Sequence, residues 1–269
     1  MIPEKIRNKI KKIRVIYSDV DGTFVHNGCL FCNKKGYTMK NVKAIFSLLT
    51  AGVDIVMTSG REKEKLKDTA RILGLQNYIA NLGIEIVYNQ GKKVINNYGI
   101  DVPNPKSLKS WIESSGVADA IFKKFTKQAL FYKPWSDILR THLLLIGELN
   151  INELTDFMEK HYPKLRIIDN GAVPPYENFN HPHAYHIVPK NVGKKTAVQI
   201  DKKERGLKRE NLIGIGDSME DVTIADEVAV FFLLDKSIQT TKENVVPVNN
   251  EDSEGFSHIV NYLKNNKLI

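Results

Sequence analysis

Two kinds of hydrophobic pattern alternate along roughly the first eighty residues of the chain. Residues 15–18, 53–57 and 78–82 form short apolar runs, as expected for strands that are covered on both faces. Residues 38–49 and 62–73 instead repeat apolar positions every three or four residues, which is typical of amphipathic helices. The order strand, helix, strand, helix, strand predicts a parallel sheet with helices packed on its faces.

The pattern changes after residue 83. Residues 84–88 and 93–97 alternate around Asn89-Gln90-Gly91, which is typical of an antiparallel hairpin. The segments that follow mix strand-like and helix-like runs. They are a helix-like run at 106–127, strands at 138–146 and 184–188, a helix at 151–161, and a turn between strands at 169–171. This mixture indicates an α+β module.

The alternation of helix and strand resumes near residue 192, with a helix at 193–203, a strand at 212–215, a helix from Met219, a strand at 228–232 and a helix at 255–264. The simplest architecture is an α/β core with a Rossmann-like parallel sheet, formed by residues 1–83 and 189–269. An α+β insertion at residues 84–188 interrupts this core. Isoleucines at helical spacing also predict a short basic helix within residues 2–13.

The composition is that of a globular protein, with 42% hydrophobic and 26% charged residues in a chain of 269. Apolar stretches are far shorter than the roughly 18 residues of a membrane span. The Lys-rich N-terminus also lacks the apolar block of a secretory signal. We therefore expect a cytoplasmic protein, monomeric or homodimeric, that binds no membrane.

The charge balance is basic, since 39 Lys and Arg against 31 Asp and Glu give a net charge of +8. Such a balance fits nucleic acid as a partner, and it equally fits small anionic substrates. The lysines are dispersed, and no aromatic-plus-basic recognition pattern accompanies them. We therefore expect no nucleic-acid partner.

The two cysteines, Cys29 and Cys32, stand in a C-x-x-C. This spacing suits a redox pair or half of a zinc site. A structural zinc site needs four ligands, the chain has no second pair, and His26 is the only nearby histidine. The pattern favours a coincidental placement in a loop.

Polar clusters follow the predicted core strands where each strand ends. Asp19-Val20-Asp21-Gly22-Thr23 follows the first strand, Ser59-Gly60-Arg61 the second, and Gly216–Asp221 the strand at 212–215, while Lys194 opens the helix after the insertion. Ligands of an open parallel sheet bind outside the carboxyl ends of its strands. We therefore expect these clusters to line one crevice.

Four carboxylates would meet in this crevice, those of Asp19, Asp21, Asp217 and Asp221. They would repel one another unless a hard divalent cation such as Mg²⁺ offsets their charge. The Ser59 hydroxyl, main-chain N–H groups such as that of Gly60, and the Lys194 ammonium suit a phosphate group. These residue types predict phosphoryl transfer, in which a carboxylate can serve as the nucleophile.

With these motifs the sequence resembles the haloacid dehalogenase superfamily of phosphatases, specifically Cof-like members with a type IIB cap. The resemblance implies that Asp19 is the nucleophile and that Asp21 is the general acid and base, with its backbone carbonyl on Mg²⁺. It implies that Ser59 and Lys194 bind phosphate. It implies further that Asp217 and Asp221 complete the metal site together with Asp19.

The position of the insertion, between the Ser59 and Lys194 motifs, corresponds to the cap that selects the substrate in this superfamily. Relatives with this cap act on small phosphorylated metabolites, so the resemblance implies a phosphorylated sugar or sugar acid as the substrate. A phosphomutase of the same superfamily is an alternative, and a non-catalytic nucleic-acid-binding protein is another. Candidate substrate contacts in the insertion are Trp135, Arg140, His142, His181, His183 and His186.

Overall fold

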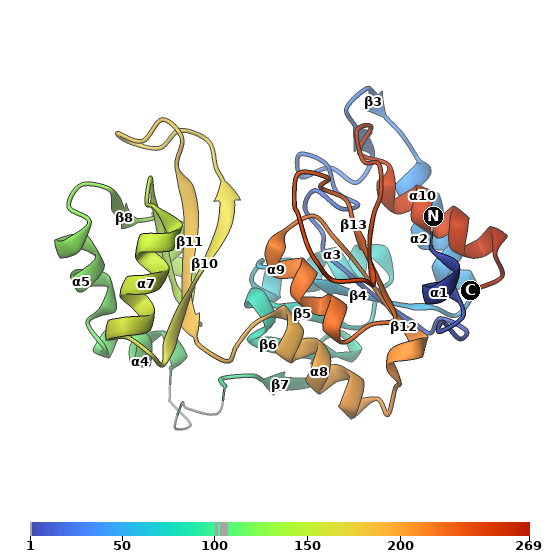
Figure 1. Ribbon diagram of the computed structural model, residues 1–269, viewed down its shortest axis with the longest axis horizontal. Coiled ribbons are helices and arrows are strands. Elements are labelled where there is room, and N and C mark those ends of the chain that lie inside the picture. The colour runs from blue at the N-terminus through green and yellow to red at the C-terminus, as the bar shows by residue number, and fades with distance from the viewer. Residues whose placement is uncertain (1, 100–101, 103–106) are drawn as a thin grey trace. The chain divides into compact units, whose positions relative to one another are not determined.

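The computed structural model describes residues 2–99, 102 and 107–269. The chain forms two compact units (Figure 1). The core unit combines the residues up to Asn97 with Gly193–Ile269, and the insertion unit comprises Tyr98–Val192. The core is therefore discontinuous in sequence, as the resumption of the strand–helix pattern predicts.

An eight-stranded sheet runs through the core unit, in the order β14-β13-β12-β1-β4-β5-β6-β7. Each strand pairs in parallel from β14 to β5, whereas β6 and β7 pair antiparallel. This arrangement confirms the predicted α/β fold class. The strands are β1 (Val15–Ser18), β4 (Asp54–Thr58), β5 (Tyr78–Ala80), β6 (Glu85–Tyr88), β7 (Lys93–Asn96), β12 (Leu212–Gly216), β13 (Val230–Leu233) and β14 (Val245–Pro247).

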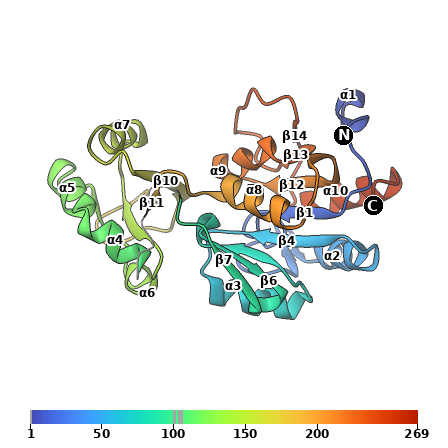
Figure 2. The same cartoon turned by 90° about the horizontal axis from the view of Figure 1, so that it is seen from below.

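Helices cover both faces of this sheet, because successive side chains of each buried strand point to opposite sides. In β1, Ile16 packs into one apolar cluster while Val15 and Tyr17 pack into another. The first cluster includes α2 (Lys40–Thr50), α3 (Lys63–Leu73) and α10 (Gly255–Asn265), and the second includes α8 (Lys194–Glu204). Figure 2 shows α3 and α8 on opposite sides of the sheet.

The ends of two helices, α3 and the N-terminal α1, are set by different interactions. Gly74 ends α3 in a left-handed conformation (φ 71°), which glycine adopts more readily than other residues. The helix at the N-terminus is shorter than expected, with α1 covering only Glu4–Arg7. Backbone N–H groups beyond α1 donate elsewhere, from Lys11 to the Glu210 carbonyl and from Ile13 to the Leu268 carbonyl.

The β6–β7 hairpin belongs to the core unit, although we expected the insertion to begin at residue 84. Its β6 strand pairs antiparallel with β5, so the hairpin extends the core sheet. The compact units divide at Asn97 and at Val192, instead of at residues 83 and 188. Alternating apolar and polar residues identify a hairpin, but they do not show which sheet the hairpin joins. The predicted boundary therefore differs from the observed one.

The insertion unit is an antiparallel sheet with helices, in the strand order β10-β11-β9-β8. Its α+β character agrees with the mixed pattern of the sequence. Its elements are α4 (Leu108–Ser114), α5 (Val117–Lys124), β8 (Ala129–Phe131), α6 (Trp135–Ile138), β9 (Leu143–Gly147), α7 (Ile151–His161), β10 (Leu165–Ala172) and β11 (His183–Pro189).

Three local expectations for the insertion unit were wrong. Gly116 (φ 71°) divides the helix-like run into α4 and α5, and residue 106 lies outside the described residues. The strand expected from residue 138 begins only at Leu143, after α6. The turn expected at residues 169–171 is a register irregularity within β10, where the Gly171 N–H donates to the Asp169 carboxylate.

The remaining elements of the core unit are short. They include the two-stranded sheet β2 (Cys32–Asn33) and β3 (Gly36–Tyr37), the helix α9 (Met219–Val222), and four 3₁₀ turns. Among the described residues, every helix is too short or too polar to traverse a lipid bilayer.

Candidate active site

Three neighbouring parallel strands bring the polar clusters to one edge of the core sheet. β1 lies between β12 and β4, and their registers place Ser18 beside Ile215 and Met57. Asp19, Ser59 and Asp217 each follow the end of one of these strands. The structure therefore brings the clusters of β1, β4 and β12 together, as parallel pairing requires.

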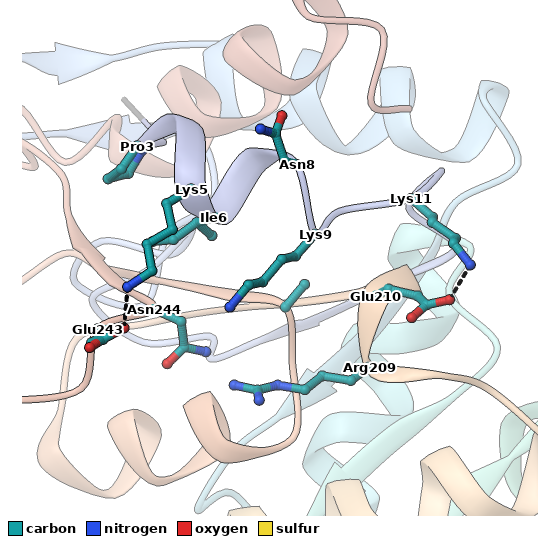
Figure 3. Close-up of a pocket in the computed structure, with 11 residues that line it drawn as sticks. Pro3, Lys5, Ile6, Asn8, Lys9, Lys11, Arg209, Glu210, Glu243 and Asn244 are labelled. Carbon is teal, nitrogen blue, oxygen red and sulfur yellow. Dashed lines mark hydrogen bonds and ion pairs between the residues drawn. The ribbon is translucent and has the colours of Figure 1, made fainter.

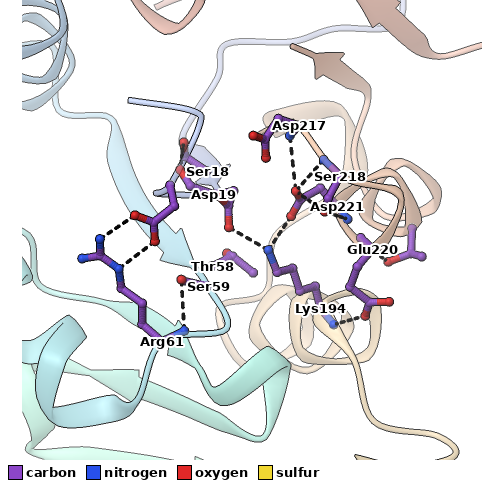
Figure 4. A network of polar contacts seen from close by, with 12 residues as sticks. Ser18, Asp19, Thr58, Ser59, Arg61, Lys194, Asp217, Ser218, Glu220 and Asp221 are labelled. Carbon is purple, nitrogen blue, oxygen red and sulfur yellow. Dashed lines mark hydrogen bonds and ion pairs between the residues drawn. The ribbon is translucent and has the colours of Figure 1, made fainter. Parts of the chain in front are cut away.

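Lys194 joins this edge from the start of α8 (Figure 4). Its Nζ lies 2.7 Å from Asp19 Oδ1 and 2.5 Å from Asp221 Oδ1, and its side chain is only 4% exposed. A Cβ atom at Gly83 would stand 2.3 Å from the Gly193 carbonyl oxygen. The close approach of these two glycines therefore seats the first turn of α8 against the core.

The Asp221 carboxylate is held by its own helix end. Its Oδ2 accepts hydrogen bonds from the Ser218 hydroxyl at 2.6 Å and the Ser218 N–H at 3.1 Å. The Asp221 N–H donates to the Ser218 hydroxyl in return, which completes a capping box at the start of α9. One Asp221 oxygen is thus fixed by the cap and the other binds Lys194, so its position is determined from both sides.

Asp19, Asp217 and Asp221 form a cluster that could hold a metal ion, with one carboxylate oxygen of each within 4.8 Å of the others. Burial, the Asp221 charge and the Asp217 charge raise the pKa of Asp19, although Lys194 opposes them. Burial and the Asp221 charge raise the pKa of Asp217 to about 7. Burial lowers the pKa of Lys194, but the two carboxylates outweigh it and the pKa is raised.

These electrostatics fit a divalent cation. One ammonium faces three acids, so the cluster carries excess negative charge, which adds to burial in raising the pKa of Asp217. Oxygen ligands in this number suit Mg²⁺, which keeps part of its water shell. Asp19, Asp217 and Asp221 are therefore the residues that would hold it.

The Asp21 carboxylate does not belong to this cluster, although we expected four carboxylates to meet. It is half-exposed and pairs with the Arg61 guanidinium, whose Nε and Nη2 lie 2.7 Å and 2.5 Å from its oxygens. Arg61 therefore neutralises Asp21, which relieves the repulsion that a fourth acid would add. Metal binding by the Asp21 backbone carbonyl stays a prediction.

Ser59 lies in a turn whose shape the backbone fixes. Its carbonyl accepts from the Leu82 N–H, and the Arg61 carbonyl accepts from the Asn81 N–H. The buried Ser59 hydroxyl accepts from the Arg61 N–H at 3.2 Å, so its own proton can be donated to a phosphate oxygen. Gly60 stands between them in the same turn, and phosphate binding by Ser59 and Gly60 stays a prediction.

Three residues of the expected clusters have roles that the sequence did not assign to them. Arg61 binds Asp21, Ser218 positions Asp221, and the Glu220 Oε1 accepts from the Lys194 N–H at 3.3 Å. The Ser218-x-x-Asp221 spacing is a capping-box signal that the sequence already contains. The Arg61 pair has no comparable signal, because it depends on the direction of two long side chains.

The candidate substrate contacts of the insertion unit divide into buried and accessible groups. His142 and His186 are buried, and His142 Nε2 lies 2.7 Å from His186 Nδ1. Burial lowers the pKa of both, to about 4 for His186, so this pair is part of the interior. His183 is paired with Asp169, while Trp135, Arg140 and His181 are exposed.

A separate hollow of about 830 Å³ lies beside the N-terminal segment (Figure 3). Lys5, Lys9, Lys11 and Arg209 give it a basic rim. Glu243 pairs with Lys5 and Glu210 pairs with Lys11. The acidic cluster contributes none of the residues that line this hollow.

Comparisons with known proteins agree with this geometry. Residues 16–166, over half of the chain, match the haloacid dehalogenase-like hydrolase family. The phosphoglycolate phosphatase of Staphylothermus marinus is 21% identical over 230 residues, which cover 81% of this chain and 83% of that protein.

Solved structures share the fold. A sucrose-phosphatase from Synechocystis sp., in complex with sucrose and phosphate, has a TM-score of 0.65 at 12% identity. The match covers 95% of this chain and 98% of the sucrose-phosphatase chain. A phosphatase of the haloalkanoate (HAD) enzyme superfamily from Bacteroides thetaiotaomicron has a TM-score of 0.65 at 15% identity. The match covers 100% of this chain and 99% of that protein's chain.

Proposed function

Because the chain belongs to the haloacid dehalogenase-like hydrolase family, and is therefore a hydrolytic enzyme, we propose that it is a Mg²⁺-dependent phosphatase acting at the Asp19 cluster. The observation that carries the proposal is the pairing of buried Lys194 with both Asp19 and Asp221. It fixes a carboxylate nucleophile beside a cation-binding set of acids, which is the arrangement that phosphoryl transfer requires.

Asp19 is the nucleophile of this proposal. Lys194 binds Asp19 Oδ1, and in the described part of the chain no hydrogen bond reaches the other oxygen, Oδ2. Oδ2 would attack phosphorus in line with the leaving oxygen, which forms an aspartyl-phosphate. Lys194 opposes the rise that burial causes in the pKa of Asp19, and its ion pair fixes the direction of the carboxylate, so little reorientation is needed before attack. When bound, Mg²⁺ would offset the negative charge of the phosphoryl group.

Asp21 is the proton-transferring residue of this proposal. It lies two positions beyond the nucleophile, and Arg61 fixes the position of its carboxyl group. To protonate the leaving oxygen it must carry a proton and turn away from Arg61. After the leaving group departs, the same carboxylate would take a proton from the water that hydrolyses the aspartyl-phosphate.

The Ser59 hydroxyl and the N–H groups of its turn, with Gly60 among them, would donate to the phosphoryl oxygens. Similarity to a phosphoglycolate phosphatase and to a sucrose-phosphatase supports a small phosphorylated sugar or sugar acid as the substrate. Selection of the substrate by the insertion unit, which the family resemblance implies, stays a prediction.

A phosphate-release screen tests this function. Purified protein is incubated with Mg²⁺ and a panel of phosphorylated sugars, sugar acids and an aryl phosphate, and inorganic phosphate is measured. We expect Mg²⁺-dependent release from several members, with the highest kcat/KM for a small sugar or sugar-acid ester. An enzyme that shows no release, or release unaffected by chelation of divalent cations, would contradict the proposal.

A further inference from the structure

Cys29 and Cys32 lie with their sulfur atoms 2.6 Å apart, and both side chains are partly exposed. The Cys32 thiol donates a hydrogen bond to the Cys29 sulfur. A disulfide bond joins its sulfurs at about 2.05 Å, so closing this gap requires only a small movement. The pair therefore has a geometry that a coincidental placement in a loop does not require.

The backbone on both sides of the pair holds it in place. His26 and Cys29 exchange two backbone hydrogen bonds, of 3.0 Å and 2.9 Å, around Asn27 and Gly28. Those two residues have φ angles of 48° and 74°, which is typical of a two-residue hairpin turn. Cys32 begins β2 and pairs with Tyr37 of β3. Each cysteine thus occupies a defined position in a ladder of backbone hydrogen bonds.

The segment that carries the cysteines is fastened to the core and continues from the active site. The Asn33 amide donates to the buried Glu254 at 2.7 Å, and the Thr38 hydroxyl donates to the same carboxylate at 3.2 Å. Towards the active site, Asp21 forms a bridge with Val25, directly before the hairpin turn. The cysteine pair is therefore part of one hydrogen-bonded segment that begins at Asp21.

Solvent reaches both cysteines through a hollow of about 690 Å³, which His26, Lys34 and Tyr37 also line. Metal binding is the other chemistry that two such cysteines offer. In the part of the chain that the structure describes, neither cysteine belongs to a group of three side chains able to share a metal ion. Solvent therefore reaches two cysteines that have no third metal ligand beside them among the described residues, and this favours oxidation of the pair over metal binding.

We propose that Cys29 and Cys32 are a modification site, a dithiol that small hydroperoxides or small disulfides convert reversibly into an intrachain disulfide. The hydrogen bond to Cys29 raises the pKa of the Cys32 thiol, which leaves less thiolate on Cys32. Cys29 accepts that hydrogen bond, and in the proposed order Cys29 reacts first. Its sulfur attacks one oxygen of hydrogen peroxide, which gives the Cys29 sulfenic acid and hydroxide. The Cys32 sulfur then displaces the sulfenic oxygen as water, and the disulfide forms.

With oxidised glutathione the same product forms by exchange. The Cys29 thiolate displaces one glutathione thiolate and forms a mixed disulfide, and Cys32 then displaces the second glutathione. In either case two thiols lose two electrons and two protons, which the oxidant accepts. A thiol reductant reverses the reaction.

The disulfide would tighten the segment that follows Asp21. It links the His26–Cys29 turn covalently to β2, so opening either one alone becomes less favourable. We expect amide hydrogen exchange within residues 22–37 to slow by about tenfold on oxidation.

Intact mass and thiol counting on the full chain test the proposal. The reduced protein is treated with hydrogen peroxide or oxidised glutathione, and we expect loss of both thiols, a mass lower by two hydrogen atoms and recovery with dithiothreitol. In Cys32→Ser, oxidised glutathione should leave a stable adduct on Cys29, whereas Cys29→Ser should form its adduct more slowly.

A lasting glutathione adduct on the wild-type chain, a sulfonic acid or a disulfide between chains would overturn the proposal. Tightly retained Zn²⁺ that protects both thiols of the reduced protein would also overturn it. None of these readouts measures phosphate release, so failure here is distinct from failure of the proposed phosphatase function.

Discussion

The Asp217 carboxylate lies against Gly22, so closely that a Cβ atom at residue 22 would stand 1.8 Å from Asp217 Oδ2. The motif of the nucleophile and the motif of the third acid are therefore in direct contact, across the pair of strands β1 and β12. Gly22 also has a φ of 77°, which disfavours other residues there. Two separate physical reasons thus require glycine at this position.

We predict that Gly22→Ala displaces the Asp217 carboxylate and weakens Mg²⁺ binding. The expected result is at least a tenfold rise in the Mg²⁺ concentration for half-maximal activity, since one of three acidic ligands moves. Gly28→Ala is a matched control, because Gly28 has a φ of 74° and open space around its Cβ position. Equal Mg²⁺ dependence in the two variants would show that the contact between Gly22 and Asp217 does not matter.

Lys194→Met should lower both stability and activity. The substitution leaves Asp19 and Asp221 without their ammonium in a buried site, a change that typically costs about 3–5 kcal/mol of unfolding free energy. Urea unfolding at neutral pH in the absence of divalent cations measures it. Lys195→Met is the control, because the Lys195 side chain is 40% exposed and pairs with Asp226, so we expect its free energy of unfolding to change by less than about 1 kcal/mol. Similar losses for the two lysines would argue against a buried ion triad.

Arg61→Gln should affect the position of the Asp21 carboxyl group without much effect on the stability of the fold. The pair with Asp21 is half-exposed, so unfolding should change by less than about 1 kcal/mol. Activity should fall about tenfold or more, because the Asp21 carboxylate loses the bidentate partner that fixes its position. Steady-state kinetics of phosphate release measure this loss. A kcat equal to that of the wild-type enzyme would mean that Arg61 does not position Asp21.

The insertion unit should be sensitive to acid through its buried histidines. Burial lowers the pKa of His142 and His186, in the latter to about 4, and the charge of Lys109 lowers that of His142 further. An unfolded histidine has a pKa near 6.5, so below that pH the unfolded chain binds protons that the folded unit excludes. Stability should therefore be full above about pH 6.5 and should decrease as the pH falls towards 4.

Hydrogen exchange of β9 and β11, followed between neutral and mildly acidic pH, measures this loss. His186→Gln should flatten the dependence, whereas the exposed His181→Gln should leave it unchanged. A wild-type protein whose insertion unit keeps full protection at low pH would contradict the inferred burial of uncharged imidazoles.

Much of the core was predictable because its signals are local. The runs that became β1, β4 and β12 are apolar and short, and the polar residues of the site follow them directly in sequence. The position of Lys194 was also predictable, since it opens a helix after the insertion. Each of these statements depends on residues that are neighbours along the chain.

The features that sequence patterns did not predict depend on tertiary contacts. The β6–β7 hairpin adds to the edge of β5, a choice of partner that its own alternation does not encode. Likewise, Asp21 turns away from the other acids because Arg61 reaches it from the β4 side. His142 and His186 meet only because β9 and β11 pair antiparallel. Motif spacing therefore identified the acids but not which of them lie together in one cluster.

Trapping of the covalent intermediate tests the role of Asp19 most directly. Asp21→Asn should slow the hydrolysis of the aspartyl-phosphate, so acid quenching of this variant with an aryl phosphate and Mg²⁺ should leave a phosphoryl group on the peptide that contains Asp19. Asp19→Asn should carry no phosphoryl group and should lose activity at least a thousandfold, about 4 kcal/mol of transition-state stabilisation. Phosphorylation of another residue, or near-normal phosphate release from Asp19→Asn, would contradict the mechanism.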